Sequence, residues 1–289
     1  MNPIPSVETL QITVLVEDSV SMWKADLIAK HGISLLIEAS VAGTTSRILM
    51  DAGPPPDIAL KNADIIGVDM RKVDGIVISH GHYDHTGALL EILKRIGAAV
   101  PVVAHPKAFR PKFVYKPNLK FIGSAFDQSS VKANGATLLL ARNSVKITDG
   151  VMTSGEIARD SGFEKTEGFF TVEDDCLIED PMVDDQALFI KVKDQGLVVI
   201  TGCAHSGIIN TVRHAQKITG VKEVYALVGG FHLAEADDKR IQASINELVR
   251  INPKSIYPGH CTGSKAIHEL SNILQDRCRP IQTGDVIQL

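Results

Sequence analysis

Apolar residues along the chain follow two alternating patterns, one typical of strands and one typical of helices. Alternation in steps of two, or a short apolar run between turn residues, predicts a strand. Spacings of three and four that begin near Pro, Asp or Ser and end near Gly predict a helix. Strand patterns cover residues 11–16, 32–40, 47–53, 73–79, 100–105, 136–141, 143–148, 168–172, 187–192, 197–202, 224–230 and 255–260. Helical patterns cover residues 56–68, 86–98, 206–218, 238–251 and 264–277.

Strand and helix patterns are interleaved over the whole chain, and no segment resembles a linker. In the helix predicted over 86–98, Thr86 is placed to cap the N-terminus and Gly97 to end the helix. Residues 106–126 are basic and aromatic without a clear period, so we expect them to be irregular. The pattern predicts a layered α/β fold in which sheets pack together and helices cover the outside. We expect a single domain over 1–289, with an insertion around 106–170 that could cover a substrate.

Composition narrows the classes of function. With 44% hydrophobic and 22% charged residues the chain is typical of a globular protein. A net charge of -4 lacks the basic excess of nucleic-acid-binding proteins, so we expect no nucleic-acid partner. The first residues do not resemble a signal peptide, and no stretch approaches the roughly 18–20 apolar residues that span a bilayer. We therefore expect a cytoplasmic protein with no membrane partner. Its oligomeric state is left open.

A cluster of metal-binding side chains, His80, His82, Asp84 and His85, directly follows the strand predicted over 73–79. The spacing of His80 and His82 lets two imidazoles face one ion, while Asp84 and His85 can turn towards a neighbouring position. Neutral imidazole suits zinc, iron or manganese, and a carboxylate adds an anionic ligand. A metal in such a site can make a bound water acidic near neutral pH. The sequence therefore predicts a metal site here rather than a solvated polar loop.

Three later histidines, His205, His232 and His260, occupy the same kind of position. Each follows a strand-like apolar run and a small residue. Rigid strands aim the loops at their ends into a shared crevice, where α/β proteins commonly build their sites. We therefore expect these histidines to lie near the first cluster.

The stretch His80–His85, HGHYDH, matches the HxHxDH signature of the metallo-β-lactamase superfamily, and LMDAG at 49–53 resembles that superfamily's strand ending in Asp-x-Gly. The resemblance implies an αββα sandwich of two mixed β-sheets flanked by helices. It implies His80, His82 and His205 as ligands of one metal, and Asp84, His85 and His260 as ligands of the other. Asp84 would also be the catalytic residue. The implied cofactor is a pair of divalent ions, for which zinc is expected and iron, manganese or magnesium are alternatives.

The chain departs from the superfamily pattern at one position. Many members have an Asp after a hairpin strand that bridges both metals, whereas the comparable hairpin here ends Thr201-Gly202-Cys203. A Cys203 thiolate could bridge the metals or bind one of them, or it could take no part, which is what we expect. His232 could instead fill the bridging position, but we expect it in the pocket wall.

A narrower resemblance comes from the segments 16–39, 79–89, 153–159, 198–211, 229–233 and 258–263. Together they resemble the branch that includes the 7,8-dihydropterin-6-methyl-4-(β-D-ribofuranosyl)aminobenzene 5'-phosphate synthases of methanopterin biosynthesis. Membership would imply a transferase that joins an aryl amine to a dihydropterin diphosphate and expels pyrophosphate. Two divalent ions could stabilise the leaving group and orient the nucleophile.

A phosphorylated or diphosphorylated small molecule would need cations in its pocket. The region after His105 is rich in them, and its aromatic residues could sandwich a ring. A solvated basic loop is an equal alternative. Candidate substrate-binding residues are His105, Lys107, Arg110, Lys112, Arg159 and His232.

Two other functions remain open. The same metal pair could activate water in a hydrolase acting on a phosphoester, lactone or thioester. The chain could also be a non-enzymatic metal or redox sensor whose working groups are Cys203 and Cys261. Asp18 and His31, in loops near predicted strand ends, either orient the metal ligands or lie on the surface.

Overall fold

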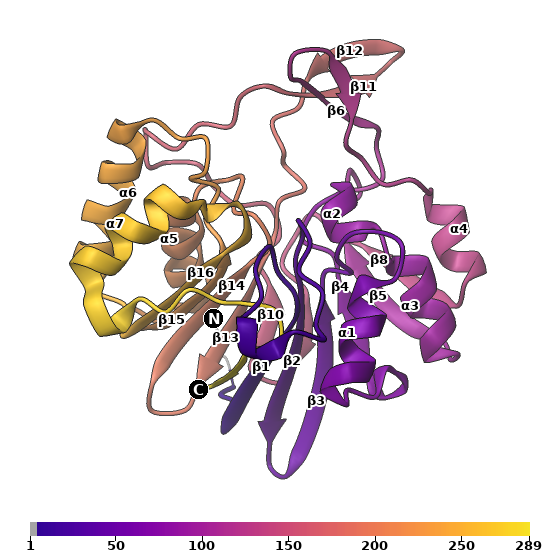
Figure 1. Ribbon diagram of the computed structural model, residues 1–289, viewed down its shortest axis with the longest axis horizontal. Coiled ribbons are helices and arrows are strands. Elements are labelled where there is room, and N and C mark those ends of the chain that lie inside the picture. Colours follow the sequence, from indigo (N-terminus) through magenta and orange to yellow (C-terminus); the bar gives the residue numbers. More distant parts are fainter. Residues whose placement is uncertain (1–4) are drawn as a thin grey trace.

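Two β-sheets packed face to face form the centre of the fold, and helices cover both outer faces (Figure 1). The computed structural model describes residues 5–289. The 7-stranded sheet has the order β17 (Val286–Gln288), β1 (Thr9–Val16), β2 (Ser34–Val41), β3 (Thr44–Met50), β4 (Gly75–Val77), β5 (Val100–Ala104) and β8 (Ala136–Leu140). The 6-stranded sheet has the order β16 (Ser255–Gly259), β15 (Val224–Gly230), β14 (Gly196–Thr201), β13 (Ala187–Val192), β10 (Val151–Thr153) and β9 (Lys146–Thr148).

The helices form one layer on each side of the sandwich (Figure 1). On the side of the 7-stranded sheet lie α1 (Ile58–Ile66), α3 (Leu89–Ile96) and α4 (Gln128–Ala133), with the short α2 (Tyr83–Thr86) near the sheet edge. On the other side lie α5 (Ile208–Thr219), α6 (Asp238–Ile251) and α7 (Ser264–Leu274). Turns of 3₁₀ helix occur at Met22–Lys24, Met70–Lys72, His260–Thr262 and Gln275–Arg277. The predicted αββα architecture is confirmed. No helix within residues 5–289 has both the length and the apolar character needed to cross a membrane.

Three hydrophobic clusters account for the layers. Alternate residues of the facing strands, such as Ile12, Ile37 and Val198, fill the space between the sheets. A second cluster joins the 7-stranded sheet to α1 and α3, and a third joins the 6-stranded sheet to α5, α6 and α7. Each sheet is therefore buried on both faces, which explains why several of its strands read as unbroken apolar runs.

Sequence patterns located most of these elements, with two corrections. Thr86 does not cap α3, because it belongs to α2 and Ala88 is the residue that precedes α3. Gly97 does end α3, at a φ of 68° that the absence of a Cβ makes inexpensive. The region 106–126 is not wholly irregular, because it contains β6 (Lys112–Tyr115) and β7 (Leu119–Phe121).

These two strands belong to a small sheet that stands apart from the sandwich (Figure 1). Its order is β12 (Cys176–Glu179), β11 (Phe169–Glu173), β6 and β7, all paired antiparallel. The strands are short, and β7 and β12 are exposed along their whole length, which weakens the alternation on which a strand prediction depends. The small sheet lies above the sandwich edge at which β4, β14, β15 and β16 end (Figure 1).

Candidate metal centre

Three histidines from two strand ends converge on one point. His80 and His82 follow β4, and His205 follows β14 in the other sheet. Nε2 of His80 is 2.9 Å from Nδ1 of His82 and 3.2 Å from Nε2 of His205. Two nitrogens bound to one tetrahedral zinc ion, at Zn–N distances of about 2.0–2.1 Å, would lie about 3.3 Å apart. The spacing therefore fits ligands around a common ion.

The charge state of these histidines also suits metal binding. All three are buried, and burial lowers the pKa of His80 and of His205 well below the ordinary value. Burial likewise lowers the pKa of His82 to about 3. The imidazoles are therefore neutral near pH 7, the form that can donate a lone pair to a metal.

A second group of donors lies beside the first. Oδ2 of Asp84 is 3.5 Å from Nε2 of His85 and 3.3 Å from Nε2 of His260, which follows β16. Burial alone would raise the pKa of Asp84, but His85 and His260 hold it well below its usual range. Burial alone would lower the pKa of His85, but Asp84 and Asp51 raise it to about 9. The carboxylates that stabilise a proton on His85 would also stabilise a divalent ion that replaces this proton.

Asp51 orients this half of the site and was not among the predicted site residues. It follows β3 and is buried. Its carboxylate accepts hydrogen bonds from the backbone N of Ser79 at 2.7 Å, from Oγ of Ser79 at 2.6 Å and from Nδ1 of His85 at 2.7 Å. This leaves Nε2 of His85 as the nitrogen available to a metal. The Asp-x-Gly motif marks the strand end in sequence, but the partners of Asp51, Ser79 and His85, lie in the segment that follows β4.

Asp18 has the corresponding role for His260. One carboxylate oxygen of Asp18 is 2.7 Å from Nδ1 of His260, and the other is 2.8 Å from Nδ1 of His31. Glu17, also not predicted, accepts a hydrogen bond of 2.6 Å from the backbone N of His260. Of the two alternatives left open for Asp18, the geometry fits the one in which it orients a metal ligand.

Cys203 lies between the two groups of donors. Its sulfur is 3.1 Å from Nε2 of His85, and it forms compact donor sets both with His80 and His205 and with His85 and His260. Burial raises the pKa of the Cys203 thiol, so a thiolate here requires a neighbouring cation. His232 lies further out, with its ring 4.2 Å from that of His205 and in a donor set with Cys203 and Cys261.

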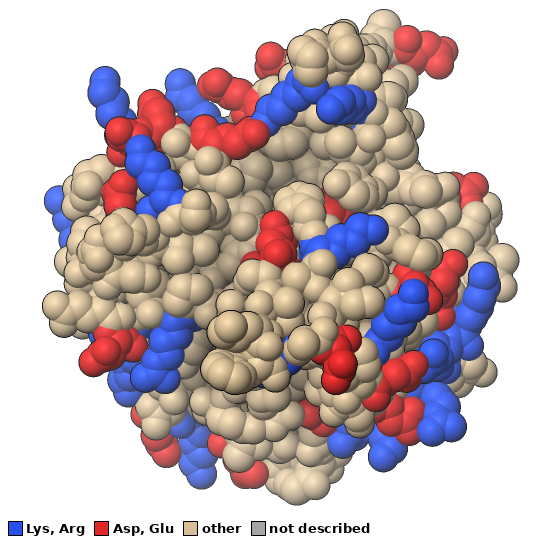
Figure 2. All heavy atoms as spheres, viewed as in Figure 1, with Lys and Arg blue, Asp and Glu red and all other residues tan. Residues whose placement is uncertain are grey.

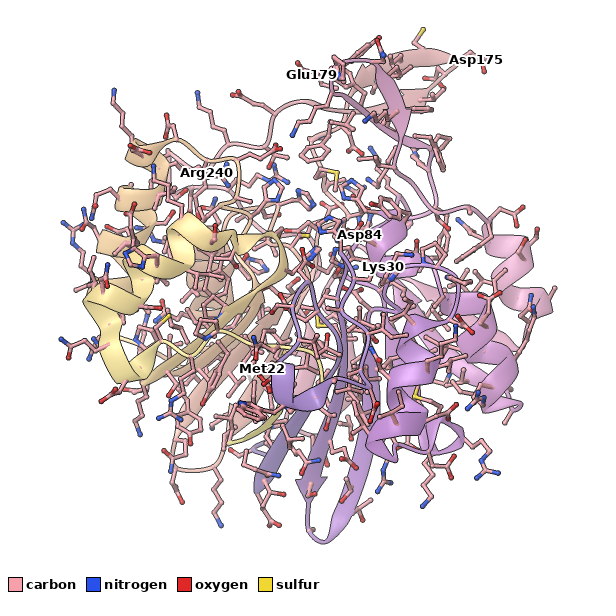
Figure 3. The ribbon with its side chains drawn as sticks, in the orientation of Figure 1. Met22, Lys30, Asp84, Asp175, Glu179 and Arg240 are labelled. Carbon is pink, nitrogen blue, oxygen red and sulfur yellow. The ribbon has the colours of Figure 1, made fainter. Side chains whose placement is uncertain are left out.

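A cavity of about 610 Å³ opens on several of these donors, among them His82, Asp84 and His260. Asp84 is in its wall, at the sandwich edge and below the small sheet that carries Asp175 and Glu179 (Figure 3). The visible face is hollowed at this level, with positive and negative side chains mixed around the hollow (Figure 2). Phe169 of β11 forms part of the wall, with its ring 5.3 Å from that of His82 and 5.0 Å from that of His205. Phe169 was missed as a site residue because its position depends on the small sheet.

The predicted substrate cations lie elsewhere. Arg110 pairs with Glu173 at 2.7 Å, and Lys107 lies 3.9 Å from the same carboxylate. Lys112 is buried between Asp180 and Asp184, at 2.7 and 2.8 Å. None of these three cations lines the cavity at the metal donors.

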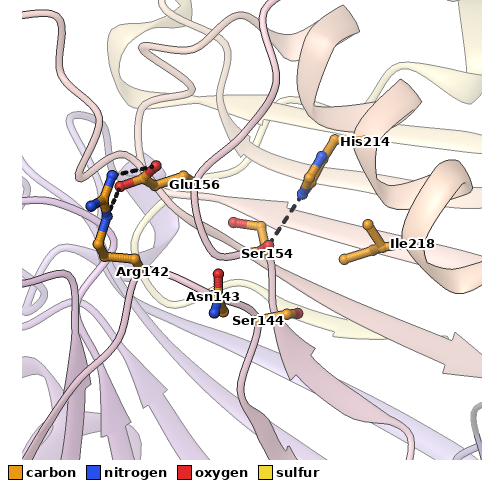
Figure 4. Close-up of a pocket in the computed structure, with 7 residues that line it drawn as sticks. All are labelled: Arg142, Asn143, Ser144, Ser154, Glu156, His214 and Ile218. Carbon is orange, nitrogen blue, oxygen red and sulfur yellow. Dashed lines mark hydrogen bonds and ion pairs between the residues drawn. The ribbon is translucent and has the colours of Figure 1, made fainter.

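Arg159 and His105 do not line this cavity either. Arg159 donates to the backbone O of Met182 at 2.9 Å. His105 is 3.0 Å from Glu156, which also pairs with Arg142 in the wall of a separate cavity (Figure 4). Instead, Lys116 lines the cavity at the metal donors, where it pairs with Glu235. Lys165 and Arg240 line an adjoining cavity of about 430 Å³ that shares Lys116, Phe169 and His232 with the first.

The fold and the paired donor groups define a class of protein. The model of the metallo-β-lactamase superfamily matches residues 32–182, and the chain belongs to that superfamily. Its members are generally enzymes that bind divalent metals. The histidine and carboxylate donors described above are suited to such ions.

Two individual proteins and one crystal structure are similar to this chain over most of its length. A 7,8-dihydropterin-6-methyl-4-(β-D-ribofuranosyl)-aminobenzene-5'-phosphate synthase of Methanocaldococcus jannaschii is 33% identical over 291 residues, which cover 99% of this chain and 98% of that protein. An uncharacterized protein of the same organism is 32% identical over 245 residues, covering 85% of this chain and 89% of that one. The crystal structure of a metal-dependent hydrolase of the β-lactamase superfamily superposes with a TM-score of 0.82 at 26% identity, covering 97% of this chain and 99% of that one. The resemblance predicted from the motifs is confirmed.

Proposed function

We propose that the protein is a metal-dependent transferase that joins 6-hydroxymethyl-7,8-dihydropterin diphosphate to 4-(β-D-ribofuranosyl)aminobenzene 5'-phosphate. The bond between the pterin methylene carbon and the diphosphate oxygen breaks, and a carbon–nitrogen bond to the aryl amine forms. Pyrophosphate leaves, and the amine loses a proton. The similarity to the synthase over nearly the full length of both chains carries this proposal.

The donor groups would hold two divalent ions, zinc being the expected metal. When bound, the ions would supply positive charge for the leaving diphosphate. The first would be held by His80, His82 and His205, and the second by Asp84, His85 and His260. Asp84 is also the proposed catalytic residue, because its ionised carboxylate lies in the cavity wall and can accept a hydrogen bond from the attacking amine.

The cavity supports an aromatic, anionic substrate. Its volume of about 610 Å³ is within the range of small-molecule sites, about 300–1,000 Å³. Phe169 offers a ring face for a pterin or benzene ring, and Lys116 offers a cation that would have to leave Glu235 to bind phosphate. The small sheet would cover the substrate, as expected of the insertion around 106–170, because it contributes Val114, Lys116 and Phe169 to the cavity wall.

Pyrophosphate release tests the proposal. Purified protein with zinc should release pyrophosphate from the dihydropterin diphosphate only when the ribosylated aryl amine is present, with equal amounts of coupled product. His82→Ala, which removes one donor of the first group, is the matched control and should release none. Equal release without the amine would contradict transfer and favour hydrolysis.

Hydrolysis is the second candidate, and the high structural similarity to a metal-dependent hydrolase favours it. The same donors could serve attack by water on a phosphoester, lactone or thioester. A panel of these three ester classes, assayed with the wild type and His82→Ala, tests it. Turnover of one class together with no amine-dependent coupling would replace the transferase proposal.

A further inference from the structure

Cys203 lies close to members of both donor groups. It lies two residues after the end of β14, is buried, and its sulfur lies 3.1 Å from Nε2 of His85. Its sulfur and the donor nitrogens of His80 and His205 all lie within 4.8 Å of one another, and the same holds for its sulfur with His85 and His260. No other residue of 5–289 is shared in this way by both histidine sets.

Each group of donors is one ligand short of a tetrahedral site. The first group offers three imidazole nitrogens, and the second offers two imidazole nitrogens and one carboxylate oxygen. Zinc in proteins is mostly bound by four ligands, with a thiolate at about 2.3 Å. A single sulfur between the groups could serve both ions at once, and zinc that expands to five ligands would still have a position for the substrate.

We propose that Cys203 is a thiolate ligand that bridges both metal positions, in the place where many superfamily members have an aspartate. Two ions each about 2.3 Å from one sulfur can lie about 3.5–4 Å apart without lengthening either bond, because that distance is shorter than the roughly 4.6 Å of a linear arrangement. That separation is the range found in two-metal sites, about 3.5–4 Å. This inference rests on the proposed metal centre, but it concerns the kind of metal that the centre selects.

The backbone around Cys203 is built to hold the sulfur in this position. A Cβ on Gly202 would come within 2.2 Å of Oγ of Ser79 and 2.7 Å of Oδ2 of Asp51, so only glycine lets the end of β14 lie against the Asp51 carboxylate. Ala204 has a φ of 56°, an unusual conformation for a residue other than glycine. The turn sends His205 back towards His80, so that Cys203 and His205 face the same centre.

Cys261 is the alternative sulfur ligand. It forms a separate donor set with Cys203 and His232, and its thiol lies 3.4 Å from the backbone O of Cys203. It belongs to neither of the sets that contain His80 or His85. The geometry therefore assigns the bridge to Cys203 and leaves Cys261 at the cavity wall.

A bridging thiolate changes the metal preference of the centre. Thiolates favour zinc, cobalt and iron, whereas carboxylate sites suit magnesium and manganese. The centre should therefore discriminate against magnesium and manganese more strongly than one bridged by aspartate. Cys203→Asp, which restores the ligand common in the superfamily, should still bind two ions but lose much of this discrimination.

Cobalt(II) titration of the metal-free protein, followed by absorption, tests the assignment. The wild type should bind two equivalents and show a thiolate-to-cobalt charge-transfer band that grows with both. Cys203→Ser and Cys203→Asp should lose the band, while Cys203→Asp keeps the two equivalents. Cys261→Ala is the matched control and should retain the band. Far-ultraviolet circular dichroism checks that each variant is folded.

A band that persists in both Cys203 variants would overturn the proposal. Loss of the band in Cys261→Ala alone would move the sulfur ligand to Cys261 and overturn it as well. Two cobalt equivalents without any charge-transfer band would exclude a thiolate ligand but leave the transferase proposal intact. Conversely, failure of pyrophosphate release with a normal band would exclude the proposed reaction and leave the bridge in place.

Discussion

Replacing Lys112 by methionine should destabilise the protein strongly without acting on substrate binding. The side chain of Lys112 is 2% exposed, and its ammonium lies 2.7 Å from Asp180 and 2.8 Å from Asp184. Burial alone would lower the pKa of Lys112, but Asp184 and Asp180 raise it, so the group is charged. Methionine has nearly the same length and no charge, so the change leaves two buried carboxylates without their cation.

The expected cost follows from this burial. Removing one partner of a buried ion pair costs about 3–5 kcal/mol, because the remaining charge is uncompensated. At about 2.1 cal/mol/K per residue, unfolding this 289-residue chain has an entropy of about 0.6 kcal/mol/K. The melting temperature should therefore fall by about 5–8 °C, as measured by differential scanning calorimetry of the metal-free protein.

Two further variants test whether the lost stability comes from the buried ion pairs of Lys112. Lys112→Met combined with Asp184→Asn should recover part of the loss, because one stranded charge is removed. Lys116→Met, which removes a half-exposed cation paired with Glu235, should cost about 0–1 kcal/mol, or less than about 2 °C. A Lys112→Met variant that melts with the wild type but has a raised KM would refute the structural role and support the substrate role predicted from sequence.

Three other predictions concern the site and one helix. Asp18→Asn removes the charge of the group that orients His260. The affinity for the second ion should therefore fall about 10–100-fold in a chelator competition, while the affinity for the first ion is unaffected. Equal loss of both ions would contradict this. His82→Ala and His260→Ala should each bind less metal by elemental analysis while retaining the wild-type circular dichroism, and a full complement of two ions in either variant would remove that residue from the ligand set. Asp127 caps α4, and hydrogen bonds from the backbone and hydroxyl of Ser130 and from a neighbouring hydroxyl lower its pKa to about 2. Because the folded pKa lies below the ordinary value of 3.8, this stabilisation is present above about pH 4 and lost as the pH falls towards 2. The melting temperature of Asp127→Ala should accordingly lie below that of the wild type at pH 5 and converge with it near pH 2, and a constant difference would show that ionisation is not involved.

The candidate metal donors could be located from the sequence because each follows a short apolar run that predicts a strand. His80 to His85 follow an apolar run, and His205 and His260 each follow another, so strand ends alone indicated where donors could gather. The pairing of donors into two groups came from resemblance to the superfamily and stays a prediction, and the structure places the members of each group near one another.

The substrate residues were less predictable, because a cation's partner is set by tertiary contacts. The basic character of 105–120 suggested phosphate binding, yet Lys112 is neutralised by Asp184 and Arg110 by Glu173, each more than sixty residues away in the chain. Phe169 and Lys116 reach the cavity only because β11 and β6 pair in the small sheet. Sequence periodicity carries no information on such pairings when the strands are short and largely exposed.

The sequence by itself determined the layered α/β fold and the strand ends at which the candidate metal donors lie. Hydrophobic periodicity and strand-end histidines are local features. They can be recognised in the sequence without knowing which residues they contact in the folded protein. Only the tertiary structure decided that Cys203 lies between both donor groups, that Asp51 and Asp18 orient His85 and His260, and that Lys112 is an internal ion-pair partner. Each of those roles is a relation between residues distant in the chain, and packing of the two sheets and the small sheet is what creates it.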